Sequence, residues 1–326
     1  MRLIPDGRGV TLTVMTMGDL FRAAVWALMA PSCLGMQLGG AKSPLLPSGE
    51  ELVRNHAAIP GRRAAPQVTV SRPSTASRAA QWNRLVIEAL RDIHRHGAGG
   101  YSVEDRAIDA LIGAFRWDAK RRRPHFDPAG ARPSFCSGAV YCVLLSALMK
   151  WDAAHPAPRI SPAAWKALLP LRAKDGVLPW GYANANGPGF ALLIRELGAG
   201  YSFTDARYAR PGDVMKIWWN DAIGGRERGH LVIFIKATAD SLTFWSSNMP
   251  TDRARGGYGF KTIPRRDAKR ILFTRITNPA AFNRAPRITH NPWLSSLLHQ
   301  PSTWEECILR CGIRTATGRP PAPRRP

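Results

Sequence analysis

Apolar residues in the first half of the chain recur at helical spacing. Over residues 82–93 and 107–115 they return every third or fourth position, the pattern of one buried face of an α-helix. A longer apolar stripe covers residues 140–151, and two shorter helices are predicted over 161–171 and 190–197. The first half of the chain is therefore predicted to be helical.

The spacing changes after Gly200, where β-branched and aromatic residues gather in short runs separated by turn residues. These runs cover residues 214–219, 230–235, 241–245 and 270–276. Helices first and strands second predict an α+β fold in which helices pack on an antiparallel sheet. A basic, proline-containing loop over residues 120–133 precedes the longest apolar helix.

The two ends of the chain, residues 1–76 and 279–326, show neither the helical nor the strand spacing of apolar residues over most of their length. Residues 1–41 contain a basic residue, a short apolar run and then small residues, which is the order of a secretory signal. We expect export to the periplasm or cell envelope, or a cytoplasmic protein if this segment is not a signal. Residues 42–76 are rich in Pro, Ser, Arg and Ala and are predicted to be a linker. The folded domain is predicted over 77–278, followed by a partly disordered extension over 279–326.

Composition indicates a folded protein with an excess of positive charge. The chain has 326 residues, 45% of them hydrophobic, and 11 tryptophans, which is enough for a substantial core. Its net charge of +23 favours an acidic or polyanionic partner, although Arg- and Ala-rich usage is also typical of a GC-rich genome. The basic residues are spread along the chain without a basic-aromatic stripe, so no specific nucleic-acid partner is predicted. The apolar run near the N-terminus is too short for a transmembrane span.

Cysteine content argues against a disulfide framework. The chain has an odd number of cysteines, namely Cys33, Cys136, Cys142, Cys307 and Cys311. The last two lie four positions apart on a predicted helix, but a metal site there would need both His290 and His299 as further ligands. We therefore expect structural thiols at these two positions, no bound metal and no cofactor.

Cys136 occupies a position that is typical of a reactive thiol. It lies just before the apolar stripe over 140–151 and is therefore predicted to fall in the first turn of that helix. The unpaired N–H groups and the positive end of the helix dipole at such a place favour thiolate over thiol. The alternative is a small buried hydrophobic residue. A histidine partner elsewhere in the chain decides between these interpretations.

A histidine and a polar side chain on two neighbouring strands complete a candidate catalytic group. His230 opens the most hydrophobic strand and follows a polar loop, a setting in which burial tunes the pKa of an imidazole. On the next strand, the period of two places Phe244, Ser246 and Asn248 on one face. Asn248 is predicted to orient the imidazole, with Ser246 as the alternative. A nucleophile, a base and an orienting group together predict a thiol hydrolase.

Three short motifs resemble one family. Cys-Ser-Gly-Ala-Val at 136–140 resembles the nucleophile motif of the NlpC-type papain-like peptidases, which remodel bacterial cell walls. Ala-Arg-Pro-Gly-Asp-Val at 209–214 resembles the family's turn at the start of the sheet, and residues 229–235 resemble its histidine strand. The motifs follow the family's order and together cover residues 132–277. Three features depart from the family. Phe135 stands where an Asp is usual, the stretch between Cys136 and His230 is long and contains two extra predicted helices, and no histidine occurs over 245–248, where the family often has one.

This resemblance implies a papain-like fold in which the cysteine helix packs on the antiparallel sheet. It implies that Cys136 is the nucleophile, His230 the base and a polar residue of the next strand the orienting group. The implied substrates are amide bonds of peptidoglycan or of another peptide. An acyltransferase that uses the same thiol, and a non-catalytic basic binding protein, are the alternative functions.

The segment over 180–189 is predicted to be either a wall of the substrate cleft or a tight turn before a helix. Candidate oxyanion or substrate-binding residues are Ser134, Trp180, Tyr182, Asn184 and Asn186.

Overall fold

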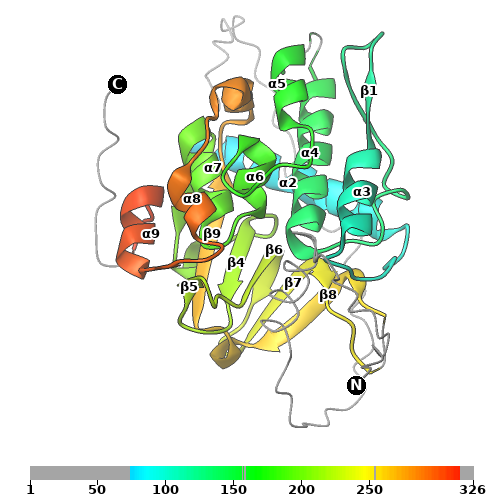
Figure 1. Ribbon diagram of the computed structural model, residues 1–326. Coiled ribbons are helices and arrows are strands. Elements are labelled where there is room, and N and C mark those ends of the chain that lie inside the picture. The colour runs from blue at the N-terminus through cyan, green and yellow to red at the C-terminus, as the bar shows by residue number, and fades with distance from the viewer. Residues whose placement is uncertain (1–73, 156, 158, 253–254, 316–326) are drawn as a thin grey trace, which may run out of the picture.

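Helices cover one face of a six-stranded antiparallel sheet in the computed structural model (Figure 1). The structure describes residues 74–155, 157, 159–252 and 255–315. The predicted signal segment, nearly all of the predicted linker and the end of the C-terminal extension lie outside these described residues. The α+β class predicted from the sequence is confirmed.

The helices of the first half precede the sheet, as their periodicity predicts. They are α2 (Thr75–His94), α3 (Asp105–Gly113), α4 (Cys136–Ala153), α5 (Pro162–Leu168), α6 (Leu178–Asn184) and α7 (Gly189–Leu197). Local signals set several of their ends. Ser161 accepts a hydrogen bond from the N–H of Ala164 and so caps α5, and Gly198 ends α7 in the left-handed conformation that glycine tolerates best.

A two-stranded antiparallel hairpin of β1 (Phe115–Asp118) and β2 (Arg123–Phe126) overlaps the loop predicted over 120–133, and its first strand takes Phe115 from the predicted helix. The strands of the second half are β3 (Gly200–Phe203), β4 (Val214–Trp218), β5 (Ile223–Gly224), β6 (Gly229–Ala237), β7 (Ser241–Asn248), β8 (Gly257–Pro264), β9 (Arg270–Ile276) and β10 (Pro301–Ser302). The main sheet has the order β3-β9-β4-β6-β7-β8, and β5 pairs separately with β10. Every pairing between these strands is antiparallel.

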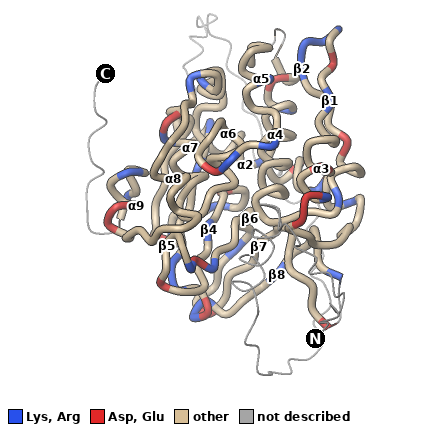
Figure 2. The backbone as a smooth tube through the Cα atoms, in the orientation of Figure 1, with Lys and Arg blue, Asp and Glu red and all other residues tan. Residues whose placement is uncertain are grey.

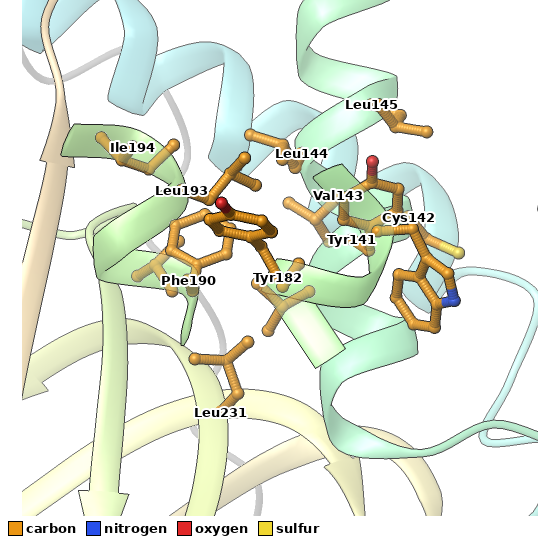
Figure 3. Packing of buried hydrophobic residues seen from close by; sticks show 14 of the residues in the cluster. Tyr141, Cys142, Val143, Leu144, Leu145, Tyr182, Phe190, Leu193, Ile194 and Leu231 are labelled. Atoms are coloured by element: carbon orange, nitrogen blue, oxygen red, sulfur yellow. The ribbon is translucent and has the colours of Figure 1, made fainter. Parts of the chain in front are cut away.

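The sheet separates two hydrophobic cores. On β6, Leu231 and Ile233 belong to the larger core together with the helices, whereas Val232 and Phe234 belong to a smaller core on the opposite face. Figure 3 shows Leu231 among side chains of the helical layer. Because side chains alternate along a strand, each position of β6 can be assigned to one of the two faces.

Helix α4 lies at the centre of the larger core. Its side chains are buried on nearly all sides, and it contacts α2 along its length and the strands β6 and β7 below it. A helix that is apolar all round must be enclosed by other elements. Because other elements enclose α4, the position of Cys136 at its first residue is fixed.

The predicted C-terminal extension contributes to this core. Its elements are η3 (Pro279–Arg287), a 3₁₀ helix, followed by α8 (Pro292–Ser296) and α9 (Trp304–Cys311). Phe282, Leu294 and Cys307 are completely buried in the same cluster as α4. Within the described residues, no helix has the length and hydropathy needed to cross a membrane.

Candidate active site around Cys136

Cys136 is the first residue of α4 and carries a partly exposed thiol. The three other cysteines of the described chain, Cys142, Cys307 and Cys311, are buried and unpaired. Phe135 precedes the helix in an extended conformation, and its side chain makes no capping hydrogen bond. The N–H groups of the first turn are therefore left without a side-chain acceptor, and such groups favour an anion or a polarised carbonyl oxygen.

Ser134 fastens the segment before Cys136 to the sheet. Its hydroxyl donates to Ser247 Oγ over 2.8 Å, and Ser247 Oγ donates in return to the Ser134 carbonyl over 3.0 Å. The Ser134 backbone also bonds to Gly100 and Ser102 on the neighbouring segment. Because its hydroxyl proton is already engaged, Ser134 acts in holding the loop rather than as a free oxyanion donor.

Tyr101 is a neighbour of Cys136 that the sequence patterns do not reveal. It forms a parallel bridge with Ser134, which brings it to the start of α4. Burial and the charge of a Cys136 thiolate both raise the pKa of the Tyr101 phenol, so this hydroxyl stays protonated. Since Tyr101 is 35 positions away in a glycine-rich loop between helices, no spacing rule connects it to the cysteine.

A chain of hydrogen bonds leads from the first turn of α4 to a carboxylate. Ser137 Oγ donates to Asn184 Oδ1 over 2.7 Å, and Asn184 Nδ2 donates to Asp175 Oδ1 over 3.2 Å. Burial raises the pKa of Asp175 to about 6, although Asn184, the charge of Lys216 and the N–H of Asn186 act in the opposite direction. Two of the predicted site residues, Asn184 and Asn186, thus lie in this network, and Asp175 is a member that the sequence analysis missed.

Trp180 and Tyr182 belong to the core and not to a cleft wall. Trp180 is 2% exposed and packs against the ring of Tyr141 at 5.0 Å between centroids. Tyr182 is 1% exposed, and its hydroxyl oxygen lies 3.0 Å from each of two acceptors, Glu196 Oε2 and the Thr289 carbonyl. Figure 3 shows Tyr182 among the apolar side chains of this core. Neither side chain is available to a substrate, because α6 turns its aromatic residues inward.

His230 and Asn248 face each other across β6 and β7. His230 Nε2 lies 3.2 Å from Asn248 Oδ1, and Asn248 Nδ2 donates to the carbonyls of Ser246 and Gly259. Since the amide nitrogen is engaged in this way, Asn248 Oδ1 accepts the hydrogen bond and His230 carries its proton on Nε2. Burial lowers the pKa of His230 to about 4, with the charges of Lys261 and Lys216 acting in the same direction and the hydrogen bond to Asn248 opposing them.

The His230 ring lies on the sheet face opposite α4. By alternation along β6 it points with Val232 and Phe234, and it packs edge-on against Phe244 at 5.6 Å between centroids. The helices occupy the other face, where Leu231 and Ile233 point. The structure therefore brings His230 together with Asn248 but does not bring this pair to Cys136, and no hydrogen bond joins the thiol to the imidazole in the described chain.

Ser246, the alternative orienting residue, also has a structural role. It is completely buried, and its hydroxyl donates to the Leu231 carbonyl over 2.8 Å. This bond ties β7 to β6 beside the His230 pair. The Ser246 hydroxyl therefore does not bond to the His230 imidazole, as the alternative prediction requires.

A buried ion pair lies on the same sheet face as α4. Lys216 Nζ is 2.6 Å from Glu227 Oε1, and Glu227 Oε2 accepts the N–H groups of Gly187 and Gly224. Lys216 pairs with Leu231 across β4 and β6, which fixes it on the helical side. The positive charge of Lys216 lowers the pKa of Asp175, which links this ion pair to the network at the start of α4.

Cys307 and Cys311 do not take part in a metal site within the described residues. No set of three or more His, Cys, Asp or Glu side chains in this part of the chain is placed to hold a metal ion. Burial raises the pKa of Cys307 to about 12, and it raises the pKa of Cys311 well above its ordinary value. Both side chains are therefore protonated thiols in the core around α9.

Fold and geometry together define an α+β protein with a partly exposed thiol at the start of its central helix. No protein-family model matches the chain, and searches of curated proteins and of solved structures also return no match. The resemblance to NlpC-type peptidases consequently rests on the three sequence motifs.

Proposed function

We propose that the protein is a cysteine-dependent hydrolase of amide bonds, with Cys136 as its nucleophile and bacterial cell-wall peptides as its substrate class. The observation that carries this proposal is the placement of Cys136. It is the partly exposed thiol among four described cysteines, and it lies at the start of a helix that lacks a side-chain cap. The motif at 136–140 supports the same role, and export by a segment within 1–41 is part of the proposal.

The chemistry needs few groups. Cys136 Sγ attacks the amide carbonyl carbon, the carbon–nitrogen bond breaks, and the amine leaves with a proton. Water then cleaves the thioester and regenerates the thiol. The N–H groups of the first turn of α4 supply donors for the oxyanion.

We assign Asp175, and not His230, as the titratable group that acts on the thiol site. The carboxylate is linked to the first turn of α4 through Asn184 and Ser137. Because an amide side chain does not relay a proton, Asp175 is a positioning residue here, and the proton of the thiol leaves with the amine. The motif resemblance favours His230 as a base instead, so the two assignments predict different variants to be inactive.

The test is release of soluble fragments from purified peptidoglycan, followed by mass spectrometry. We expect release by the wild type and by Cys142→Ala, a matched control in which a buried thiol is removed, and none by Cys136→Ala. Release by Cys136→Ala would exclude the proposed nucleophile. Loss of activity in His230→Gln with activity retained in Asp175→Asn would assign the base role to His230.

The same experiment separates the alternative functions. An acyltransferase would yield fragments joined to an added amine, with loss of that product in Cys136→Ala. A non-catalytic basic binding protein would sediment with peptidoglycan equally well with or without Cys136, and it would release nothing.

A further inference from the structure

Positive charge is concentrated on the β1–β2 hairpin. Residues 115–126 contain five Lys or Arg side chains and one Asp, a net charge of +4 with His125 neutral. Four of the basic residues are exposed, and three of them, Lys120, Arg121 and Arg122, follow one another in the connecting loop. Figure 2 marks basic residues on this hairpin, which projects away from the main sheet.

The inner face of the hairpin is anchored to the helical core. Phe115 is buried and stacks on Phe126 at 4.5 Å between centroids. Trp117 lies on the same face, and Lys166 of α5 lies over its ring at 5.2 Å. The hairpin is therefore a fixed projection, and its outer face and loop are the parts available for contact.

Most of the charge in the hairpin has no counter-ion. Asp118 pairs with Arg121 at 3.0 Å. Among the described residues, no carboxylate lies within ion-pair distance of Lys120, Arg122 or Arg123. Arg122 also adopts a φ of 52°, a left-handed conformation that a non-glycine residue adopts at a cost. Positive charge is thus kept at a position where glycine or asparagine would fit the backbone better.

We propose that this hairpin docks the protein onto an anionic phospholipid surface. Guanidinium groups recognise phosphate oxygens in a bidentate manner, and each basic side chain near an anionic membrane adds to the attraction. The large exposed hydrophobic residues of the described chain lie elsewhere, so the hairpin would adsorb to headgroups without inserting. The proposal does not depend on the hydrolase assignment.

A membrane fits the hairpin better than a nucleic acid does. Residues 115–126 offer Arg and Lys for contacts to guanine but no Asn or Gln, the side chains that read adenine. The Trp117 ring is covered by Lys166 and so is not free to stack on a base. Docking by the loop would also leave Cys136 accessible, because Ser134 holds the start of α4 at the sheet, from which the hairpin projects away.

The test is co-sedimentation of the full chain with vesicles at low salt. Vesicles of phosphatidylcholine alone are compared with vesicles containing about one-third phosphatidylglycerol. The hairpin variant is Lys120→Gln with Arg122→Gln, which keeps the Asp118–Arg121 pair. The control variant is Arg226→Gln with Arg266→Gln, which removes the same charge from two exposed positions outside the hairpin.

We expect wild type and control to bind the anionic vesicles and not the neutral ones, with binding lost at high salt. The hairpin variant should bind the anionic vesicles about 30-fold more weakly, the effect of two basic residues at such a surface. An equal loss in both variants would overturn the proposal, since net charge alone would then explain binding. Hairpin-dependent binding to a DNA duplex without binding to vesicles would overturn it in favour of a nucleic acid.

Discussion

The pKa of His230 shows whether this imidazole is buried away from Cys136, as in the structure, or paired with the Cys136 thiolate. Burial lowers the pKa of His230 to about 4 in the folded protein, whereas an unfolded histidine has a pKa of about 6.5. In the window between these values the unfolded chain binds a proton at this site that the folded protein does not. Above pH 6.5, His230 therefore does not lower the free energy of unfolding. As the pH falls from 6.5 toward 4, the free energy of unfolding decreases.

The size of this effect follows from the difference in pKa. A difference of about 2.5 pKa values corresponds to about 3 kcal/mol of unfolding free energy, lost in full below about pH 4. The partial exposure of the ring makes this an upper limit. The substitution His230→Gln keeps a side chain that can donate a hydrogen bond to Asn248 but has no titratable group. Its stability should exceed that of the wild type increasingly as the pH falls from 6.5 to 4.

The assay is urea unfolding of both proteins at a series of pH values, together with an NMR titration of the imidazole. An imidazole paired with the Cys136 thiolate would have a raised pKa, and the wild type would then gain stability relative to the variant as the pH falls. A titration midpoint above 6.5, or a gain of that sign, would refute the placement of His230 in the smaller core.

The remaining predictions concern thiols and buried carboxylates. In native protein at pH 8, iodoacetamide should label Cys136 and not Cys142, because burial raises the pKa of Cys142 to about 12. Peptide mapping that finds Cys142 labelled as fast as Cys136 would contradict this prediction. Asp213→Asn should lower the unfolding free energy by up to about 3 kcal/mol in a denaturant titration. The Arg275 guanidinium, which lies 2.6 Å from the Asp213 carboxylate, would then be a partly buried charge without a counter-ion. Asp175→Asn should stabilise the fold at pH 7 by at most about 3 kcal/mol, since the raised pKa, about 6, makes ionisation costly there. That advantage should disappear as the pH falls below about 4, and a variant that is less stable at pH 7 would show that the carboxylate is needed for the fold.

Several features of the site follow from the sequence because they depend on local rules. The apolar stripe over 140–151 predicts a helix, and the structure begins that helix at Cys136. The strand period of two places Ser246 and Asn248 on one face of β7, and in the structure Asn248 is hydrogen-bonded to His230. Helix and strand periods depend on neighbours a few positions apart, so one sequence contains them.

Other features arise only when distant segments meet. Alternation along β6 does not say which face the helices cover, and that choice separates His230 from Cys136. Asp175 and Tyr101 reach the start of α4 from segments about 35 to 40 positions away, through loop conformations that no periodicity encodes. The polar, glycine-rich segment that contains Trp180 predicts either a cleft wall or a tight turn, but the structure forms α6 there and directs Trp180 into the core. The sequence determined most of the helices and strands and the place of the thiol at the start of a helix. Tertiary packing decided which polar groups lie beside the thiol, because those contacts join segments far apart in the chain.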